Sequence, residues 1–180
     1  MALNIRQLLH RPLRSRSHPL EPDNAASRIS AYVYGNILVL AALIPLTFSE
    51  EHTFQGVAIV LGTAVSTFIA HAFAEGVGQT VRTGVNLSRS ERLSELRNSV
   101  PVLSAAVLPA GLLAIGWWGL FDPELGQILA EITVIARIAS TNYVIGRLRG
   151  EKPTSGTFFG SLALAAAATI IVAVKIVLTH

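Results

Sequence analysis

The sequence predicts an all-α polytopic membrane protein, folded as a bundle of five transmembrane helices. Of its 180 residues, 51% are hydrophobic and 14% are charged. The apolar residues come in blocks of about 20, the length that crosses a bilayer as a helix. Few residues remain outside these blocks, so no separate globular domain is expected. Residues 29–180 should therefore form a single transmembrane domain behind a basic tail, residues 1–28.

The tail combines arginines with prolines, which stop any long helix. Its arginines are Arg6, Arg11, Arg14, Arg16 and Arg28. We interpret the tail as a cytoplasmic segment that is held at the anionic lipid surface. Nucleic acid is not an expected partner, because no aromatic residues are interleaved with the arginines. The absence of cysteine excludes disulfides, thiolate nucleophiles and Cys-based metal sites.

The predicted spans follow the apolar blocks, at about 29–48, 54–78, 99–120, 125–146 and 155–178. A short surface helix is expected over about 89–98. Its start, Ser88-Arg89-Ser90-Glu91, matches a capping box. Leu93, Leu96 and Val100 then repeat at helical spacing, opposite the charged side chains.

Small residues at four-residue spacing predict faces where helices approach closely. They occur in Ala31-xxx-Gly35, Gly62-xxx-Ser66, Ala70-xxx-Ala74-xxx-Gly78 and Gly156-xxx-Gly160. The last pair predicts that the fifth span packs against protein, and these faces together suggest a homodimer. Aromatic residues at span ends indicate interfacial belts, and they are Tyr32, Tyr34, Trp117 and Trp118. Lys175 is expected to snorkel to the interface.

The positions of lysine and arginine predict the orientation. Basic residues precede the first span, fill the link between the second and third, and fill the link between the fourth and fifth. The two opposite loops, 49–52 and 121–124, contain none. The N-terminus should therefore lie in the cytoplasm and the C-terminus outside, and the protein should be a multi-pass component of a bacterial inner (plasma) membrane.

His71 and Glu75 are the most informative ionisable pair. They are four residues apart, on one face of the second span. Ionisable groups inside a membrane are costly and usually functional. Asn36 and His71 each fall roughly 10 Å from the cytoplasmic ends of their spans, at about 1.5 Å of rise per residue. Together these residues predict a hydrated cavity that faces the cytoplasm.

The fourth span adds Glu131, Arg137 and Asn142. Glu131 lies in the outer half, whereas Arg137 and Asn142 lie toward the cytoplasm. The helix turns about 240° between Glu131 and Arg137, so these two cannot pair within their helix. Glu75 and Asn36 are the expected partners of Arg137. Glu131 is expected to be an outer-cavity or snorkelling carboxylate.

Two interpretations of these groups stay open. In one, His71 and Glu75 relay protons or meet a cation, because imidazole titrates near neutral pH. In the other, Glu75 and Arg137 form a buried pair that only orients helices, and His71 is hydrogen-bonded to a neighbour. A metal site is undetermined, since His71 and Glu75 would need further ligands from Asn36 or Glu131. No catalytic motif is present, so neither enzymatic activity nor a cofactor is expected.

Several short motifs resemble those of a group of small, uncharacterised integral membrane proteins of actinobacteria. They are Tyr34-Gly35 in the first span, Ala70-His71-Ala72-Phe73-Ala74 in the second, and Val172-Ala173-Val174-Lys175 followed by His180. The resemblance spans most of the chain and implies a bacterial inner membrane.

The predicted architecture is also similar to that of the vacuolar iron transporter family. That family has five spans, a cytoplasmic N-terminus and a Gly/Ala-rich last helix. Its members carry acidic and methionine ligands in the first two spans and a carboxylate-rich insertion after the second. Here the first span has no acid, Met1 is the only methionine and the link is basic. The similarity therefore concerns architecture alone.

We therefore expect a small proton- or cation-linked transporter or channel with a polar cavity facing the cytoplasm. The alternative is a non-transporting scaffold or accessory subunit of a cell-envelope membrane complex. The expected partners are the lipid bilayer, a second copy of the chain and a small ion or proton.

Overall fold

A computed structural model describes residues 21–46, 53–149 and 155–179. All of its elements are helices: α1 (Pro22–Leu43), α2 (Thr53–Thr83), α3 (Arg89–Trp117), α4 (Pro123–Ala139), α5 (Thr141–Arg149) and α6 (Ser155–Thr179). Most of the predicted basic tail, the loop 49–52 and most of the link between α5 and α6 lie outside the described residues.

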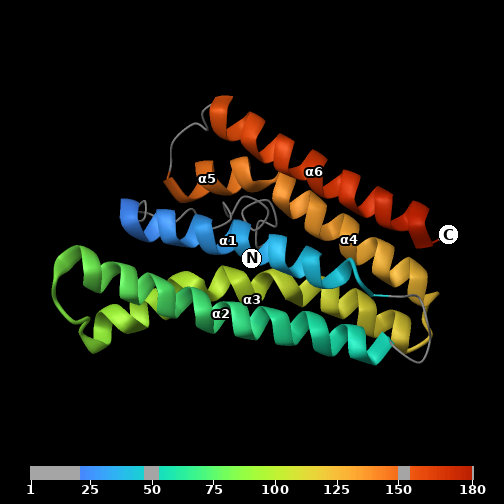
Figure 1. The fold of residues 1–180 in the computed structure, drawn as a ribbon, viewed down its shortest axis with the longest axis horizontal. Coiled ribbons are helices and arrows are strands. Elements are labelled where there is room, and N and C mark those ends of the chain that lie inside the picture. The colour runs from blue at the N-terminus through green and yellow to red at the C-terminus, as the bar shows by residue number, and fades with distance from the viewer. Residues whose placement is uncertain (1–20, 47–52, 150–154, 180) are drawn as a thin grey trace, which may run out of the picture.

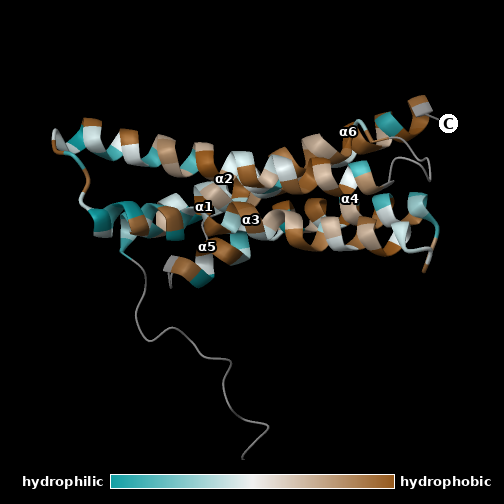
Figure 2. Ribbon diagram, turned by 90° about the horizontal axis from the view of Figure 1, so that it is seen from below, coloured by the Kyte–Doolittle hydropathy of each residue, from teal (hydrophilic) through white to brown (hydrophobic). Residues whose placement is uncertain are grey.

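The helices run roughly parallel or antiparallel along one long axis (Figure 1). We call one end of this bundle the basic end, because α1 begins there, α5 ends there, and the α2–α3 connection lies there between Arg82 of α2 and Arg89 of α3. The other end holds the ends of α1, α3 and α6. Hydrophobic residues line the middle of the helices and hydrophilic ones concentrate toward both ends (Figure 2).

This chain is a multi-pass membrane protein. Four helices, α1, α2, α3 and α6, are long and apolar enough to cross a bilayer, and α4 with α5 makes a fifth when the bent pair counts as one span. The helices exceed the predicted spans at their basic ends: α1 begins at Pro22 and α2 extends to Thr83. Pro22 suits the first position of a helix, where its missing N–H removes no hydrogen bond.

The crossing of α1 and α3 depends on a glycine. A Cβ added at Gly35 would lie 2.8 Å from the Cα of Val102, so only glycine allows this backbone approach. Ala31, one turn earlier, is fully buried. The predicted packing face of the first span is thus used within the chain.

Other predicted small-residue faces are open. Gly62, Ser66, Ala70 and Ala74 are exposed, and a Cβ at Gly62 would meet no heavy atom within 4 Å. The α6 glycines Gly156 and Gly160 are exposed as well, so they form no packing face within this chain. Instead, α6 contributes Ala165, Ala168 and Val172 to the core.

The expected surface helix is the first part of α3, which continues into the span without a break despite Pro101 and Pro109. The capping box is confirmed: Ser88 Oγ accepts from Glu91 N at 3.3 Å, and Glu91 Oε2 accepts from Ser88 N at 2.7 Å. Leu93 and Leu96 are exposed, whereas the polar side chains of Asn98 and Ser99 are buried because α1 and α2 supply their hydrogen-bond partners.

The fourth span is broken rather than continuous, with a 47° bend between α4 and α5. The Arg137 carbonyl accepts hydrogen bonds from Tyr32 Oη (2.9 Å) and Ser140 Oγ (2.8 Å). Thr141 Oγ1 donates to the Ile138 carbonyl at 2.7 Å. These side chains compete with backbone N–H groups for the carbonyls, which explains a bend without proline. Tyr32 therefore joins α1 to the end of α4 by a hydrogen bond inside the bundle, and its assignment to an interfacial belt was wrong.

Candidate functional site

His71 is buried between α2 and α3. Its Nδ1 lies 3.1 Å from Ser99 Oγ, and Ser99 Oγ donates to the Glu95 carbonyl at 2.9 Å. A hydroxyl has one hydrogen, so when Ser99 donates to the Glu95 carbonyl it accepts from Nδ1 of His71. Nε2 forms no hydrogen bond with a described residue. The Tyr34 ring lies beside the imidazole, with centroids 6.3 Å apart.

Glu75 and Glu95 continue this row of polar groups toward the basic end. We call His71, Glu75, Glu95 and Ser99 the polar seam. Glu75 forms no hydrogen bond or ion pair with a described residue, and Glu95 Oε2 is buried without a hydrogen-bond partner there. Glu95 precedes the apolar segment of α3, and burial, followed by the nearby Glu75 carboxylate, raises its pKa, while Arg82 and Asn98 oppose the rise. The seam therefore holds two acids that form no ion pair with a described residue, although Arg82 lies near enough to Glu95 to attract it.

Amides and an arginine close the seam on the α1 side. Asn98 Nδ2 donates to Asn24 Oδ1 at 2.6 Å, and Arg28 Nε donates to Asn98 Oδ1 at 2.9 Å. Both contacts join the start of α1 to the start of α3. Asn24, Arg28 and Asn98 hydrogen-bond to one another, so we assign them the structural role of holding α1 against α3 beside the seam.

Arg137 lies on the opposite side of α1, away from the seam residues of α2. Its Nε donates to Asn36 Oδ1 at 2.9 Å, and its Nη2 donates to Ser104 Oγ at 3.2 Å. The guanidinium carbon lies 5.0 Å from the centroid of the Tyr32 ring. Among the described residues no carboxylate pairs with it. Asn36 is thus confirmed as its partner, and the alternative pair between Glu75 and Arg137 was wrong.

Glu131 is not a snorkelling or cavity carboxylate. It is 2% exposed, and its Oε1 lies 2.6 Å from Lys175 Nζ. The expectation for Lys175 was wrong as well, because it is buried in this pair instead of reaching the interface. α4 and α6 pack together at this height, and an unpaired charge there would cost several kcal/mol.

The same cluster donates hydrogen bonds to the backbone carbonyls at the end of α1. Lys175 Nζ donates to the Leu43 carbonyl at 3.3 Å, and Gln127 Nε2 lies 3.0 Å from Leu43 O and 3.1 Å from Leu46 O. These carbonyls lie at the end of the helix, where the regular backbone N–H partners run out, and Leu43 O also accepts from Leu46 N at 3.2 Å. The Glu131–Lys175 cluster therefore joins α1, α4 and α6 at the end opposite the seam.

The remaining candidate, Asn142, lies in α5 beyond the break. Its Oδ1 is buried without a hydrogen-bond partner in the described part of the chain, and it shares no bond with the other candidates. The six predicted residues thus fall into different places: His71 with Glu75, Asn36 with Arg137, and Glu131 and Asn142 each apart.

Sequence reasoning missed Glu95, Ser99, Lys175 and Tyr32 as members of these sites. A signal existed for the first two: Glu95, Asn98 and Ser99 recur at helical spacing on one face of α3. For a metal, three or more His, Asp and Glu would have to converge, and no such group occurs in residues 21–46, 53–149 and 155–179.

No family model, curated protein or solved structure matches this chain. The two family resemblances remain predictions.

Proposed function

We propose that this protein is a small proton-linked transporter or channel of a bacterial inner membrane, and that the polar seam takes up protons from the cytoplasmic side. The observation that carries the proposal is the His71–Ser99 hydrogen bond beside two carboxylates that form no ion pair with a described residue. Nε2 of His71 and the acids Glu75 and Glu95 are groups that gain and lose protons. The basic end is assigned to the cytoplasm by the positive-inside rule.

The proposed uptake path ends near Thr67, which is buried one turn beyond His71. Farther along, α1, α2 and α3 meet through apolar side chains of the core, including Val60, Ala64 and Ala106. Transport would therefore require these helices to separate after a proton has been taken up, as in alternating access. A fixed open pore does not fit this packing.

The proposal is tested by proton flux into proteoliposomes that contain a pH-sensitive dye, driven by an imposed pH gradient. His71→Ala and Glu75→Gln should each reduce the flux of the unmodified protein. Glu21→Gln is the matched control, because Glu21 is an exposed carboxylate at the same end and forms no side-chain cap. If both seam variants transport like the unmodified protein, the proposal is abandoned.

The second candidate function is a non-transporting scaffold or accessory subunit of an envelope complex. It is favoured by the apolar closure beyond Thr67 and by the structural Glu131–Lys175 cluster. In this case His71→Ala and Glu75→Gln would lower thermal stability or partner recovery, and no variant would alter flux above that of protein-free vesicles.

A homodimer is part of the proposal. The open face of Gly62, Ser66, Ala70 and Ala74 would let two copies of α2 approach closely, which favours helix association in lipid. Gly62→Leu should shift the protein from dimer to monomer in light scattering of detergent-purified samples. An unchanged mass, or a monomeric unmodified protein, would exclude this interface.

A further inference from the structure

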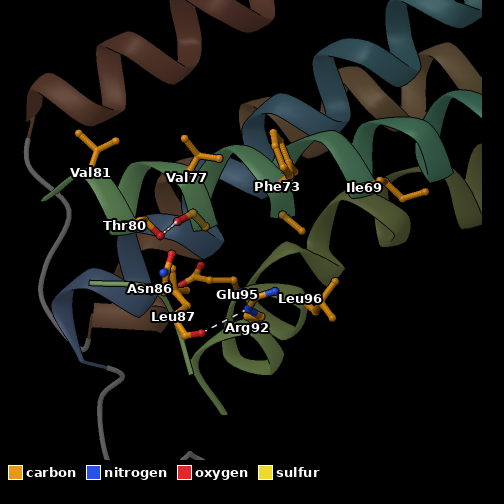
Figure 3. A pocket seen from close by; sticks show the side chains of 12 residues that line it. Ile69, Phe73, Val77, Thr80, Val81, Asn86, Leu87, Arg92, Glu95 and Leu96 are labelled. Carbon is orange, nitrogen blue, oxygen red and sulfur yellow. Dashed lines mark hydrogen bonds between the residues drawn. The ribbon is translucent and has the colours of Figure 1, made fainter. Parts of the chain in front are cut away.

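A groove runs along the outer side of α2 and α3 at the basic end (Figure 3). Its volume is about 560 Å³, within the range of small-molecule sites. Figure 3 shows Ile69, Phe73, Val77 and Val81 spaced along α2, with side chains of α3 and of the α2–α3 connection at its other wall. The α2 wall is therefore a continuous apolar track.

The mouth of the groove is basic. Arg92 lines it, and its Nε donates to the Leu87 carbonyl at 3.3 Å, which leaves the Nη groups without a partner in the described chain. Residues 82–98 contain four arginines and two glutamates, a net charge of +2. Glu95 also lines the groove, and Arg82 lies near enough to attract its carboxylate. The field at the mouth therefore favours an anion.

Depth places this mouth among lipid headgroups. α2 has 31 residues and is about 46 Å long, close to the full bilayer thickness with headgroups. Ile69 and Val81 are twelve residues apart, about 18 Å along the axis. With α2 centred in the bilayer, Ile69, Phe73 and Val77 lie at acyl-chain depth, and Val81 and the basic mouth lie at headgroup depth.

We propose that this groove binds one anionic phospholipid, with an acyl chain along the α2 track and the phosphate at Arg92. The occupant follows from the combination of charge and depth, since a zwitterionic lipid would gain less from the net positive mouth. Glu95 lines this groove and also belongs to the polar seam, but the lipid test changes no residue of the seam, so either proposal can fail without the other.

The test counts lipids retained by delipidated, detergent-purified protein in native mass spectrometry. Three probes are compared: phosphatidylglycerol, phosphatidylcholine with the same acyl chains, and glycerol phosphate without chains. Gly76→Leu fills the groove, because Gly76 lines it and a Cβ there would meet no heavy atom within 4 Å. Gly111→Leu is the matched control, with an equally open Cβ on α3 far from the groove.

We expect the unmodified protein to retain phosphatidylglycerol in preference to phosphatidylcholine. Gly76→Leu and Arg92→Gln should each weaken that retention roughly tenfold, which corresponds to about 1.4 kcal/mol. Gly111→Leu and Arg147→Gln, an exposed arginine of α5 outside the groove, should leave it unchanged.

Equal retention of the two lipids, or unchanged retention by Gly76→Leu and Arg92→Gln, would overturn the proposal. Binding of glycerol phosphate as strong as that of the full lipid would also overturn it, because the groove would then hold only an anion. Arg92→Gln changes an exposed side chain, so its result stands even if Gly76→Leu fails to fold.

Discussion

The Glu131–Lys175 cluster and the polar seam both place ionisable groups inside a membrane bundle, but the cluster buries its charged pair, whereas Glu75 and Glu95 of the seam are only partly buried. In the cluster, a 2.6 Å ion pair is completed by Gln127 and the last carbonyls of α1. In the seam, Glu75 and Glu95 lie near each other and form no ion pair with a described residue, and only Nδ1 of the His71 ring has a described hydrogen-bond partner. The carboxylate of the cluster is paired with a cation, whereas those of the seam are not, which is the basis of the proposal that the seam takes up protons.

The difference teaches which charges in this protein fasten helices and which are available for chemistry. A carboxylate with a buried cation beside it resists protonation and holds two helices together. A carboxylate beside another acid tends to take a proton, and it loses little when it becomes neutral. Four substitutions test this division, from the largest expected effect to the smallest.

Removing one charge of the cluster should have the largest effect. Lys175→Met leaves Glu131 buried and unpaired, which should destabilise the protein by about 3–5 kcal/mol. The double variant Lys175→Met with Glu131→Leu should recover most of that loss. Thermal unfolding in detergent measures the stability of both variants. If Lys175→Met alone were as stable as the unmodified protein, the Glu131–Lys175 pair would not stabilise the packing of α4 against α6.

The α1–α3 crossing supports both regions, because α1 carries Tyr34 at the seam and Leu43 at the cluster. Gly35→Ala places a methyl group against the Val102 backbone, and overpacking of this kind costs about 1–3 kcal/mol. Gly111→Ala is the control, since its Cβ has open space. Equal unfolding temperatures for the two variants would contradict the close approach.

Tyr32→Phe removes an uncharged hydrogen-bonding group rather than a charge. The hydroxyl donates to the Arg137 carbonyl and lies 3.1 Å from Ser140 Oγ, so its loss should cost about 0.5–1.5 kcal/mol. Hydrogen exchange at α5 amides should accelerate, while exchange in the apolar part of α3 stays constant. Uniform acceleration across the bundle would show that this bond does not act locally.

The seam acids should contribute least to stability. Glu75→Gln removes a charge that has no close cation, so the free energy of unfolding should change by no more than about 0.5 kcal/mol. Proton flux is the property that should fall. A loss of stability comparable to that of Lys175→Met would show that Glu75 has a structural role like that of Lys175, and the contrast between the two regions would disappear.

The membrane architecture was predictable because it depends on block length and hydropathy alone. Five apolar blocks became four long helices and a bent pair, and the capping box at Ser88 was found where its residues match. The capping residues are adjacent in sequence, so no tertiary information is needed.

The sites were predictable only in part, because their partners come from different helices. His71 and Glu75 share a helix, so spacing placed them together. Depth suggested Asn36 for Arg137, but it suggested Glu75 equally well, and only the rotation of α1 decides between them. Lys175 was assigned to the interface because its depth allowed snorkelling, whereas the packing of α6 on α4 turns it toward Glu131. The break at Ser140 follows from Tyr32, which lies far away in sequence.

The bend between α4 and α5 gives the bundle two sides of unequal height. α2 and α3 are each about 44–46 Å long, whereas α4 has 17 residues and spans about 26 Å before the chain turns by 47°. A bilayer around this molecule therefore faces longer helices at α2 and α3 than at α4. Hydrophobic mismatch should act most strongly at α4, and a thicker membrane favours straightening of the bend. Membrane thickness should therefore affect the hydrogen bonds that Tyr32 and Ser140 make to the Arg137 carbonyl.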